Sequence, residues 1–396
     1  MSGPPVLVQK FGGTSVSTAD RRGRVVEHVR RARASGLRVA IVVSAMGRRG
    51  DPYATDSLLD LLRADGGGVA PDDYDLMFTC GEAISVAVVS QALKRGGIAA
   101  TGLTAAQAGI YSNGVHLEAD VTRIDTGRLH ALLEAGTVPV VAGGQAVAPG
   151  TLDFTTLGRG GSDTSGVALG VALGACRVEI FTDVEGVYAA DPRLVPGAPM
   201  RARIGYAAMY ELARFGAKVL HPRAIAAGMA GGTPVVVRST FSEAPGTLVA
   251  DVIDEAPLVG LAALPPMETV ALPAGSVPDA VRDGWERTRL VMSIVDRDRR
   301  EIIVGAADDK AGDLRAAVDE AAVGPSRRLG RCCWLSVVGD GLALAAADPG
   351  WVQSLGTRAI DVCAREIGVR RATYVVPEAG RQAAAEVVYE TMASRV

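Results

Sequence analysis

The sequence of 396 residues is poor in aromatic side chains, histidine and net charge. Aromatic residues make up 4% of it, and the four histidines are scattered, which gives no sign of a Ser-His-Asp or Cys-His catalytic set. The formal net charge is -3, so the basic footprint of a nucleic-acid-binding protein is missing. The five cysteines are odd in number and contain no Cys-x-x-Cys pair. This pattern is typical of reduced thiols in a cytosolic protein and argues against a disulfide framework or a zinc site.

Long apolar runs are missing as well. No stretch approaches the roughly 18 consecutive apolar residues of a membrane-spanning helix. The first residues lack the charged and apolar regions of a signal peptide. Hydrophobic residues nevertheless make up 48% of the chain, enough to build sizeable cores. We therefore expect a cytoplasmic globular protein of about two to three domains that binds neither membrane nor nucleic acid.

The most informative stretch runs from Val6 to Val16. A short apolar strand leads through Lys10 into Gly12 and Gly13, and residues 19–34 then have the pattern of a basic helix. Adjacent glycines let the backbone approach a ligand closely, and a helix N-terminus attracts anions. With the lysine charge, this arrangement predicts a cradle for nucleotide phosphates, although its spacing is not that of a P-loop. An ordinary tight turn with a surface lysine is the alternative.

From residue 5 to about 250, Val/Ile-rich runs alternate with helical segments. Strands are expected at 38–43, 98–103, 138–142 and 178–181, and helices at 56–63, 75–95 and 128–134. Such alternation is the mark of an α/β fold with a largely parallel central sheet and helices on both of its faces.

Beyond residue 250 the pattern changes. Residues 255–266 contain three prolines and are expected to form a linker. Two α+β passes follow, at roughly 267–322 and 331–393, each with an early apolar run (269–272; 334–338) and a later helix (314–322; 383–392). Their similar size suggests a repeated small module, although their sequence similarity is weak.

A second glycine-rich helix start lies at residues 155–165, ahead of an apolar helix expected at 166–173. Arg159 offers a planar fork for a carboxylate or phosphate, and the glycines permit close backbone approach. Asp163 could also be a plain helix N-cap. Two anion cradles in one α/β domain would suit two anionic ligands that meet head-on.

Three further stretches are candidates for the same site. The loop at 182–193 follows a parallel strand and should lie at the carboxyl edge of the sheet, where ligands bind, or else be a plain surface loop. Lys218 precedes a His-Pro pair that we interpret as structural, and this lysine could be only a solvated charge. Glu82 lies in an otherwise apolar helix. It must therefore face solvent or be buried against a cation, such as the ammonium group of a substrate.

Together these motifs closely resemble those of aspartokinase, a member of the amino-acid kinase superfamily. The matching segments stand in the family's order and spacing at 10–16 (KFGGTSV), 44–47 (SAMG), 80–85 (CGEAIS), 155–165 (TTLGRGGSDTS), 181–193 (FTDVEGVYAADPR), 216–224 (GAKVLHPRA), 237–240 (VRST) and 245–248 (PGTL). The loop at 47–56 is similar to that of single-chain enzymes from spore-forming bacteria, including the diaminopimelate-sensitive type. The resemblance implies an amino-acid kinase catalytic domain at 1–250 and two degenerate ACT-like regulatory and dimerisation modules at 259–396.

The resemblance also implies the role of each matching residue. The catalytic residues would be Lys10 and Lys218, which hold the ATP phosphates, and Asp163, which orients these cations. Nucleotide binding would fall to Lys10, Phe11, Gly12, Gly13, Ser44, Thr182, Asp183, Tyr188, Asp191, Arg193, Ala217 and Lys218. The amino-acid substrate would be held by Thr55, Glu82, Arg159, Gly160, Gly161 and Ser162, with Glu82 on the α-ammonium group and Arg159 on a carboxylate.

The implied reaction is transfer of the ATP γ-phosphoryl group to the side-chain carboxylate of L-aspartate, the first step toward lysine and threonine. The implied cofactors are ATP and Mg²⁺, with no protein residue assigned as a metal ligand. The acceptor carboxylate is already ionised at neutral pH, so no general base is required. Catalysis should depend on positioning and charge neutralisation. The C-terminal modules imply a homodimer or a higher homo-oligomer.

Several departures from the family pattern leave alternatives open. Ala83 stands where many members have Arg, and residues 143–146 (GGQA) stand where many have GFQG. The glycine turn and the effector strand of the ACT domain are not recognisable, apart from a possible turn at 339–341. A kinase for a different carboxylic or phosphonic acceptor, or a non-catalytic subunit, is therefore also considered.

Overall fold

The structure, a computed structural model, describes residues 3–64, 66–254, 256–275, 292–320 and 326–394. The chain divides into two units. The first contains residues 1–187, 201–206 and 219–253, and the second contains residues 188–200, 207–218 and 254–396. The chain thus passes between the units several times, and each unit is described by itself.

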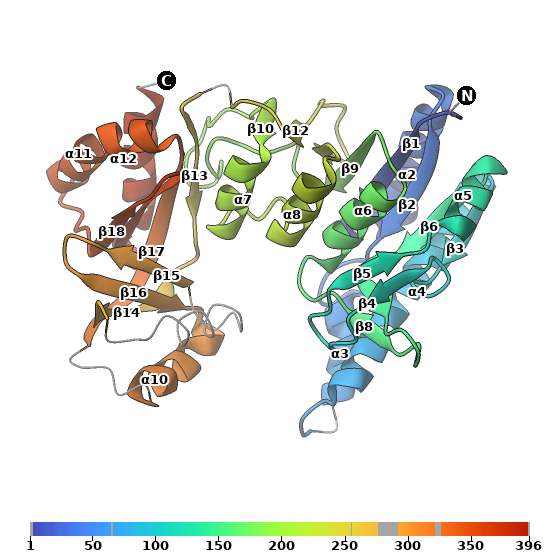
Figure 1. The fold of residues 1–396 in the computed structure, drawn as a ribbon, viewed down its shortest axis with the longest axis horizontal. Coiled ribbons are helices and arrows are strands. Elements are labelled where there is room, and N and C mark those ends of the chain that lie inside the picture. Colours follow the sequence, from blue (N-terminus) through green and yellow to red (C-terminus); the bar gives the residue numbers. More distant parts are fainter. Residues whose placement is uncertain (1–2, 65, 255, 276–291, 321–325, 395–396) are drawn as a thin grey trace. The chain divides into compact units, whose positions relative to one another are not determined.

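An eight-stranded sheet forms the centre of the first unit (Figure 1). Its strands in spatial order are β10 (Arg203–Gly205), β12 (Thr247–Ala250), β11 (Val235–Ser239), β9 (Arg177–Thr182), β1 (Val6–Phe11), β2 (Arg38–Val43), β6 (Val138–Ala142) and β3 (Ala100–Leu103). The six strands from β11 to β3 are parallel, and only β12 runs antiparallel to its neighbour β11. The predicted α/β class with a largely parallel sheet is confirmed.

Helices cover both faces of this sheet. On one face, α2 (Ala19–Ala34) and α4 (Pro71–Arg95) bury valines such as Val29 and Val89 against Leu7 and Ile41 of the strands. On the other face, α6 (Gly161–Ala172) packs against β1 and β9, and α8 (Pro222–Gly231) packs against α6. The remaining helices of this unit are α1 (Gly13–Val16), α3 (Thr55–Arg63) and α5 (Gly127–Glu134).

A smaller four-stranded sheet also belongs to the first unit. It consists of β5 (Val121–Ile124), β4 (Ile110–Ser112), β7 (Gln145–Val147) and β8 (Phe154–Thr156). The sequence pattern did not predict it. Three of its strands have only three residues, too few for an alternation of polar and apolar side chains to stand out.

Helix α4 is, by length and composition alone, apolar enough to cross a membrane. This corrects the expectation from the sequence that no stretch would qualify. Val86, Val89 and Leu93 on this helix are buried in the core next to the sheet. The core helix of a globular protein passes the same test, so the finding is weak support for a membrane span.

The second unit is built on an antiparallel sheet of seven strands. Six follow each other in the order β15 (Met292–Asp296), β16 (Glu301–Ala306), β14 (Met267–Pro273), β17 (Arg327–Gly339), β19 (Arg371–Pro377) and β18 (Ala364–Ile367), and β13 (Leu258–Ala263) pairs with β17. The helices among the described residues of this unit are α10 (Ala311–Glu320), α11 (Gly341–Thr357), α12 (Arg381–Ala393), most of α7 (Tyr206–Arg214), and the 3-10 turns η1 (Asp308–Lys310) and η2 (Glu378–Gly380).

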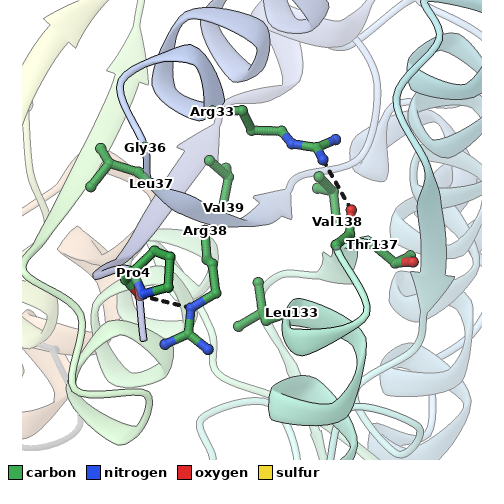
Figure 2. A pocket seen from close by; sticks show the side chains of 10 residues that line it. Pro4, Arg33, Gly36, Leu37, Arg38, Val39, Leu133, Thr137 and Val138 are labelled. Carbon is green, nitrogen blue, oxygen red and sulfur yellow. Dashed lines mark hydrogen bonds between the residues drawn. The ribbon is translucent and has the colours of Figure 1, made fainter. Parts of the chain in front are cut away.

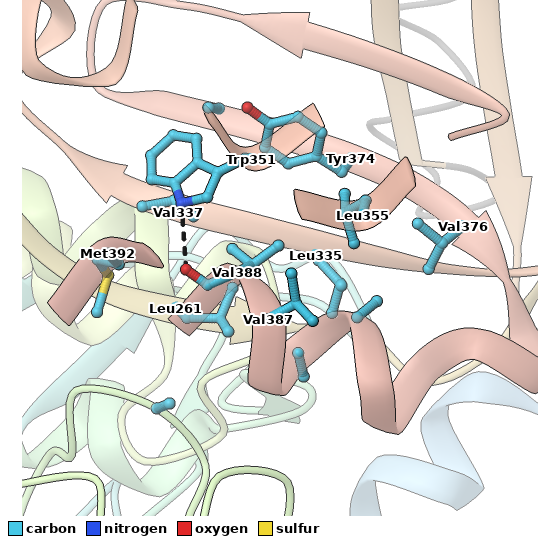
Figure 3. Close-up of a cluster of buried hydrophobic side chains, with 14 of the residues drawn as sticks. Leu261, Leu335, Val337, Trp351, Leu355, Tyr374, Val376, Val387, Val388 and Met392 are labelled. Atoms are coloured by element: carbon cyan, nitrogen blue, oxygen red, sulfur yellow. Dashed lines mark hydrogen bonds between the residues drawn. The ribbon is translucent and has the colours of Figure 1, made fainter. Parts of the chain in front are cut away.

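A hydrophobic core of the second unit lies between this sheet and helices α11 and α12 (Figure 3). Trp351 and Tyr374 meet edge-on with ring centroids 5.9 Å apart, a favourable aromatic geometry. The indole N–H of Trp351 donates to the carbonyl oxygen of Val388 at 3.1 Å. The core therefore joins both helices to the sheet and leaves no unpaired indole donor at Trp351.

One expectation for this region needs correction. The stretch at 255–266 is not a linker as a whole, because β13 occupies Leu258–Ala263 and buries Leu258 and Leu261. Its prolines lie outside the strand, where a missing N–H costs no ladder hydrogen bond. The two α+β passes also share one continuous sheet. The predicted helix at 314–322 corresponds to α10, and its last two residues lie outside the described part.

Candidate active site

The candidate site lies at the carboxyl edge of the large sheet. The parallel strands β1, β2, β6 and β9 end there, and predicted residues lie at or directly after the ends of β1, β2 and β9. Gly12 and Gly13 follow β1, Ser44 follows β2, and Asp183 follows β9. Open parallel sheets bind their ligands at this edge.

Lys10 and Asp163 are brought together at the centre of this edge. The ammonium nitrogen of Lys10 lies 2.6 Å from Oδ1 of Asp163, and the Lys10 residue is only 7% exposed. Asp163 lies in the first turn of α6 and pairs with this lysine, and the N-cap position is held by Gly160. The N-cap alternative for Asp163 is therefore wrong. The pair fixes a positive charge in a partly desolvated place where it would act strongly on an anion.

Glycine occupies the two positions after Lys10 for different physical reasons. A Cβ on Gly13 would collide with the carbonyl oxygen of Ala45, so only glycine fits there. A Cβ on Gly12 would lie 3.8 Å from the Lys10 ammonium, on the side where a ligand of that lysine would approach. The next residues form the four-residue helix α1, and α2 begins only at Ala19. The helix predicted at 19–34 is thus present as α2, with α1 between it and the glycine pair.

The second glycine-rich loop is held in a strained shape. Gly158 and Gly160 have φ angles of 68° and 70°, and a Cβ on Gly160 would overlap the ring of His221. The guanidinium of Arg223 donates to the carbonyl oxygen of Leu157 at 2.7 Å and so supports the loop from α8. Such conformations cost free energy in most residues, which explains the glycines.

Arg159 extends from this loop into solvent. Its side chain has no ion-pair or hydrogen-bond partner among the residues that the structure describes. An exposed guanidinium at the start of α6 is available for a carboxylate or a phosphate.

Glu82 is the most unusual group in the first unit. The residue is 2% exposed, so the solvent-face alternative is wrong. Oε1 accepts a hydrogen bond from the N–H of Ala45 at 3.3 Å, whereas Oε2 is buried without any partner in the described structure. Burial raises the pKa of this carboxyl group from 4.5 to about 8. A buried carboxyl oxygen without a donor is costly unless a cation binds there.

Hydroxyl groups link the two sides of the candidate site. Ser44 donates to the hydroxyl oxygen of Ser162 at 2.9 Å and so connects the end of β2 with the start of α6. Gly161 packs closely on Gly144 there. Thr55 is the first residue of α3 and is half-buried. These contacts hold the start of α6 against the segments that follow β2 and β6.

The predicted adenosine side is more open. Thr182 ends β9, and its hydroxyl donates to Asp183 at 3.2 Å. Asp183 forms an ion pair with Arg48 at 2.6 Å, and both side chains are largely exposed. Phe11 is fully buried, with its ring stacked on that of Phe181 at 4.6 Å. A nucleotide contact at Phe11 would therefore involve its backbone.

Five predicted residues belong to the second unit. Asp191 and Arg193 pair with each other at 2.7 Å, and this hydrogen bond lowers the pKa of Asp191. Tyr188 bridges to Met200, and Ala217 and Lys218 lie in the turn after α7, where Lys218 is exposed. The convergence of Lys10 and Lys218 on one ligand stays a prediction.

Sequence reasoning missed two supporting residues. Asp75 in α4 is fully buried and accepts hydrogen bonds from the hydroxyl of Thr156 at 2.6 Å, the ring of His116 at 2.8 Å and the N–H of Leu117. It thereby ties α4, which carries Glu82, to the strand that leads into the glycine-rich loop. Asp75 lies in the second turn of α4, at the position where the sequence pattern placed the start of that helix. Its partners lie 41 and 81 residues away, so the sequence carried no signal for Asp75 or for His116.

Other features fall outside this site. Among the described residues, no group of three or more His, Cys, Asp or Glu side chains could hold a metal ion. Figure 2 shows a pocket of about 240 Å³ at the amino ends of β2 and β6, opposite to the edge that carries the candidate site. Its two arginines, Arg33 and Arg38, donate to the carbonyl oxygens of Gly136 and Pro4.

The comparisons with known proteins concern the family and the fold. A profile described as "Amino acid kinase family" matches residues 5–239. Aspartokinase 1 of Bacillus subtilis is 47% identical over 244 residues, 62% of this chain and 60% of its own length. The aspartokinase of Mycobacterium tuberculosis strain H37Rv is 43% identical over 253 residues, 64% of this chain and 59% of its own. The chain thus matches about 60% of the length of these curated relatives.

Two solved structures extend the likeness to the C-terminal unit. The E. coli aspartokinase III complex with aspartate and ADP gives a TM-score of 0.78 at 21% identity and covers 98% of this chain and 99% of its own. This likeness establishes the fold. The aspartate kinase of Synechocystis is 30% identical, with a TM-score of 0.57, and covers 98% of this chain and 68% of its own.

Proposed function

Because the chain belongs to the amino acid kinase family, we propose that it is an aspartate kinase. It transfers the γ-phosphoryl group of ATP to the side-chain carboxylate of L-aspartate and yields 4-phospho-L-aspartate and ADP. The observation that carries this proposal is the buried Glu82 carboxyl group with an unpaired oxygen, at the same sheet edge as the Lys10–Asp163 pair. The Glu82 carboxyl group fits an ammonium ion, and Lys10 of the Lys10–Asp163 pair fits a phosphate.

The acceptor is bound through its two α-substituents. Its ammonium group donates a hydrogen bond to Oε2 of Glu82, and Glu82 ionises when this ammonium group binds. The free guanidinium of Arg159 and the backbone of Gly160, Gly161 and Ser162 take the α-carboxylate, which leaves the side-chain carboxylate free to react. Thr55 contributes a hydroxyl on the acceptor side.

The nucleotide is bound by its phosphates at the first glycine-rich loop. Lys10 and Lys218 neutralise phosphate charge, Gly12 and Gly13 let the backbone approach, and Asp163 holds Lys10 in place. Mg²⁺ would supply further neutralisation of phosphate charge when bound. The adenosine side would be formed by Ser44, Thr182, Asp183, Tyr188, Asp191, Arg193 and Ala217 together with the backbone of Phe11.

The chemical step is an in-line displacement. An oxygen of the ionised acceptor carboxylate forms a bond to the γ-phosphorus while the bond to the β,γ-bridging oxygen breaks, and ADP leaves. No side chain has to remove a proton, because the acceptor carboxyl group has an ordinary pKa near 4. The chain contributes positioning of two anions and stabilisation of the charge that develops between them.

The proposal also includes the wider setting. The protein acts in the cytoplasm at the first step of the aspartate-family pathway, as a homodimer or higher homo-oligomer. Residues 1–250 form the catalytic domain, and residues 259–396 form two degenerate ACT-like modules that serve dimerisation.

A second candidate differs only in the acceptor. Ala83 follows Glu82 on α4 and is half-buried, so the site has no cation where many relatives have Arg. This feature favours a kinase for another carboxylic or phosphonic acid.

One assay separates these functions. Purified protein is incubated with ATP, Mg²⁺ and a panel of amino acids, and the acyl phosphate is trapped with hydroxylamine. We expect hydroxamate with L-aspartate, and none with the Lys10→Ala variant. A larger turnover with another acid would favour the second candidate. ATP binding without any hydroxamate would indicate a non-catalytic subunit.

A further inference from the structure

The turn after α7, residues 215–218, carries Lys218 and lies wholly within the second unit. We call this segment the lysine turn. The N–H of Ala217 donates to the carbonyl oxygen of Leu212 at 2.9 Å, which ties the turn back to the end of α7. Lys218 itself is exposed. Where its ammonium group can reach therefore depends on how the backbone of the lysine turn is held.

The antiparallel sheet of the second unit supports the lysine turn at two positions. Gly216 has a φ angle of 124°, and a Cβ there would collide with the carbonyl oxygen of Ala263 at the end of β13. The ring of Phe215 is buried, and the guanidinium carbon of Arg371 in β19 lies 3.8 Å from its centroid. The turn thus packs on β13 through its backbone and on β19 through an aromatic ring.

Arg371 has an acceptor at each of its three guanidinium nitrogens. Nε donates to Oε2 of Glu211 in α7 at 3.2 Å, and Nη2 donates to Oε2 of Glu366 in β18 at 2.7 Å. Nη1 donates to the hydroxyl oxygen of Thr373. The side chain is only 16% exposed. These contacts fix the orientation of the guanidinium and join α7 to the sheet.

This arrangement requires a guanidinium rather than any positive charge. The planar fork of arginine can pair with two carboxylates while its flat face stacks on an aromatic ring. A lysine ammonium is a point charge without such a face. A lysine at position 371 could keep an ion pair with Glu211 or Glu366, but it would leave the ring of Phe215 without its stacked partner.

We propose that Arg371 is a positioning residue for Lys218. It fixes α7 and the lysine turn to the sheet, and it thereby places the Lys218 ammonium group for an ATP phosphate. This inference rests on the proposed function, in which Lys218 binds phosphate. A ligand-binding side chain on a well-held backbone loses less conformational freedom when the ligand binds, so removal of Arg371 weakens ATP binding. Aspartate binding is unaffected, because the residues assigned to the acceptor all belong to the first unit.

Arg365 in β18 offers a matched control. Its guanidinium also joins two carboxylates, those of Asp298 at 2.8 Å and Asp348 at 2.7 Å. Within the described part of the chain, its side chain pairs with no residue of α7 or of the lysine turn. Arg365→Lys therefore removes a guanidinium from the same sheet and leaves the support of Lys218 intact.

ATP binding to the full chain tests the proposal. Calorimetry with ATP and Mg²⁺ gives the affinity, and the hydroxamate assay gives kcat and both KM values. Arg371→Lys should weaken ATP binding and raise the KM for ATP about fivefold, and Arg371→Met should do so about tenfold. In both variants the KM for aspartate should stay unchanged and kcat should stay within about twofold. Arg365→Lys should bind ATP as the unaltered protein does. Thermal melts verify that each variant is folded.

A second background shows whether Arg371 acts through Lys218. Lys218→Ala should weaken ATP binding by itself, and adding Arg371→Lys should then weaken it by less than about twofold more. Hydrogen exchange measures the turn directly. The N–H of Ala217 should exchange roughly tenfold faster in Arg371→Met and at an unchanged rate in Arg365→Lys.

Two results would overturn the proposal: an unchanged ATP affinity in both Arg371 variants, or an undiminished effect of Arg371→Lys in the Lys218→Ala background. Failure of the proposed function is a separate outcome, because it would appear as absence of hydroxamate from the unaltered protein. ATP binding is measured without turnover. An ATP affinity that still depends on Arg371 through Lys218 would then support the positioning role alone.

Discussion

Replacing Glu82 with glutamine should weaken aspartate binding and, at alkaline pH, stabilise the protein. Glutamine keeps the size of the side chain and the acceptor for the Ala45 N–H, but it cannot ionise. Burial raises the pKa of Glu82 to about 8, so only about a tenth of the free protein carries the carboxylate at pH 7. Binding of the substrate ammonium requires that ionised form.

The pH dependence of binding follows from this pKa. The apparent affinity is reduced by the fraction of protein in the competent state, so aspartate affinity should rise about 50-fold from pH 6 to pH 8. Calorimetry at pH 7 in buffers of different ionisation enthalpy should record release of nearly one proton per aspartate bound. The Glu82→Gln variant should bind aspartate on the order of 100-fold more weakly at pH 8, where a charge-assisted hydrogen bond is lost. It should also release no proton.

Stability should change in the opposite direction. The pKa of Glu82 is higher in the folded state than the ordinary value of 4.5, so the folded state binds the extra proton between these two pH values. The free energy of unfolding then falls by about 1.4 kcal/mol per pH unit from pH 4.5 to pH 8. Glutamine removes this loss, so Glu82→Gln should gain about 3–5 kcal/mol at pH 8 and less than about 1 kcal/mol at pH 5.

A matched control is Glu179→Gln. Glu179 is also buried, but it accepts hydrogen bonds from Arg177 at 2.9 Å and from Gln9 at 2.9 Å. Removing its charge leaves these donors poorly paired, so this variant should lose roughly 1–3 kcal/mol in urea unfolding. If Glu82→Gln binds aspartate as tightly as the unaltered protein, or is less stable than it at pH 8, the role given to Glu82 is wrong.

Three other changes test the rest of the site. Asp163→Asn removes the charge that faces Lys10 at 2.6 Å and should lower turnover about 100-fold or more in the hydroxamate assay; an unchanged rate would contradict its role. Gly160→Ala places a Cβ into the ring of His221 and should raise the KM for aspartate. Gly174→Ala is the control, because the φ angle of Gly174 is also positive (59°) but a Cβ there would contact no other atom. In a double-mutant cycle on ATP affinity, Lys10→Ala and Lys218→Ala should be coupled by about 1 kcal/mol or more, and additive effects would argue against a shared ligand.

Elements with a strong local pattern were predictable from the sequence. The strands at Arg38–Val43 and Val138–Ala142 and the helix at Ala19–Ala34 begin and end where the sequence pattern placed them. The two strands are runs of Val and Ile between turn residues, and Thr18 caps the helix. In these segments, local conformational preference and burial in the core favour the same structure, so the local pattern alone predicts it.

Elements that depend on distant contacts were not predictable. Helix α11 continues through Pro349, which lacks an N–H and normally interrupts a helix. It forms nevertheless, because Asp340 caps its start and Trp351 and Leu355 bury their side chains in the core. Strand β13 similarly owes its place to pairing with β17, far along the chain. Tertiary burial overrides a weak local signal in both cases.

The candidate site was predictable in its residue types but not in its energetics. Glycine and lysine motifs indicated the anion cradles. Glycine is required at Gly13 and Gly160 because a Cβ at either position would collide with neighbouring atoms. The sequence left open whether Glu82 faces solvent, and it gave no sign of Asp75, whose partners come from distant segments. Spacing can therefore locate a loop. The pairing of buried acids is decided only when the chain folds.

The contrast between these two acids separates support from binding. Asp75 is fully buried and has donors on both oxygens, so it stabilises the fold. Glu82 is equally buried, but one of its oxygens has no donor among the described residues. Selection for stability alone would replace such a group with a neutral side chain. A buried acid that costs stability and has an unpaired oxygen at the ligand-binding edge of the sheet therefore has its physical explanation in a cation that arrives from outside. An amino-acid substrate brings that cation in its ammonium group.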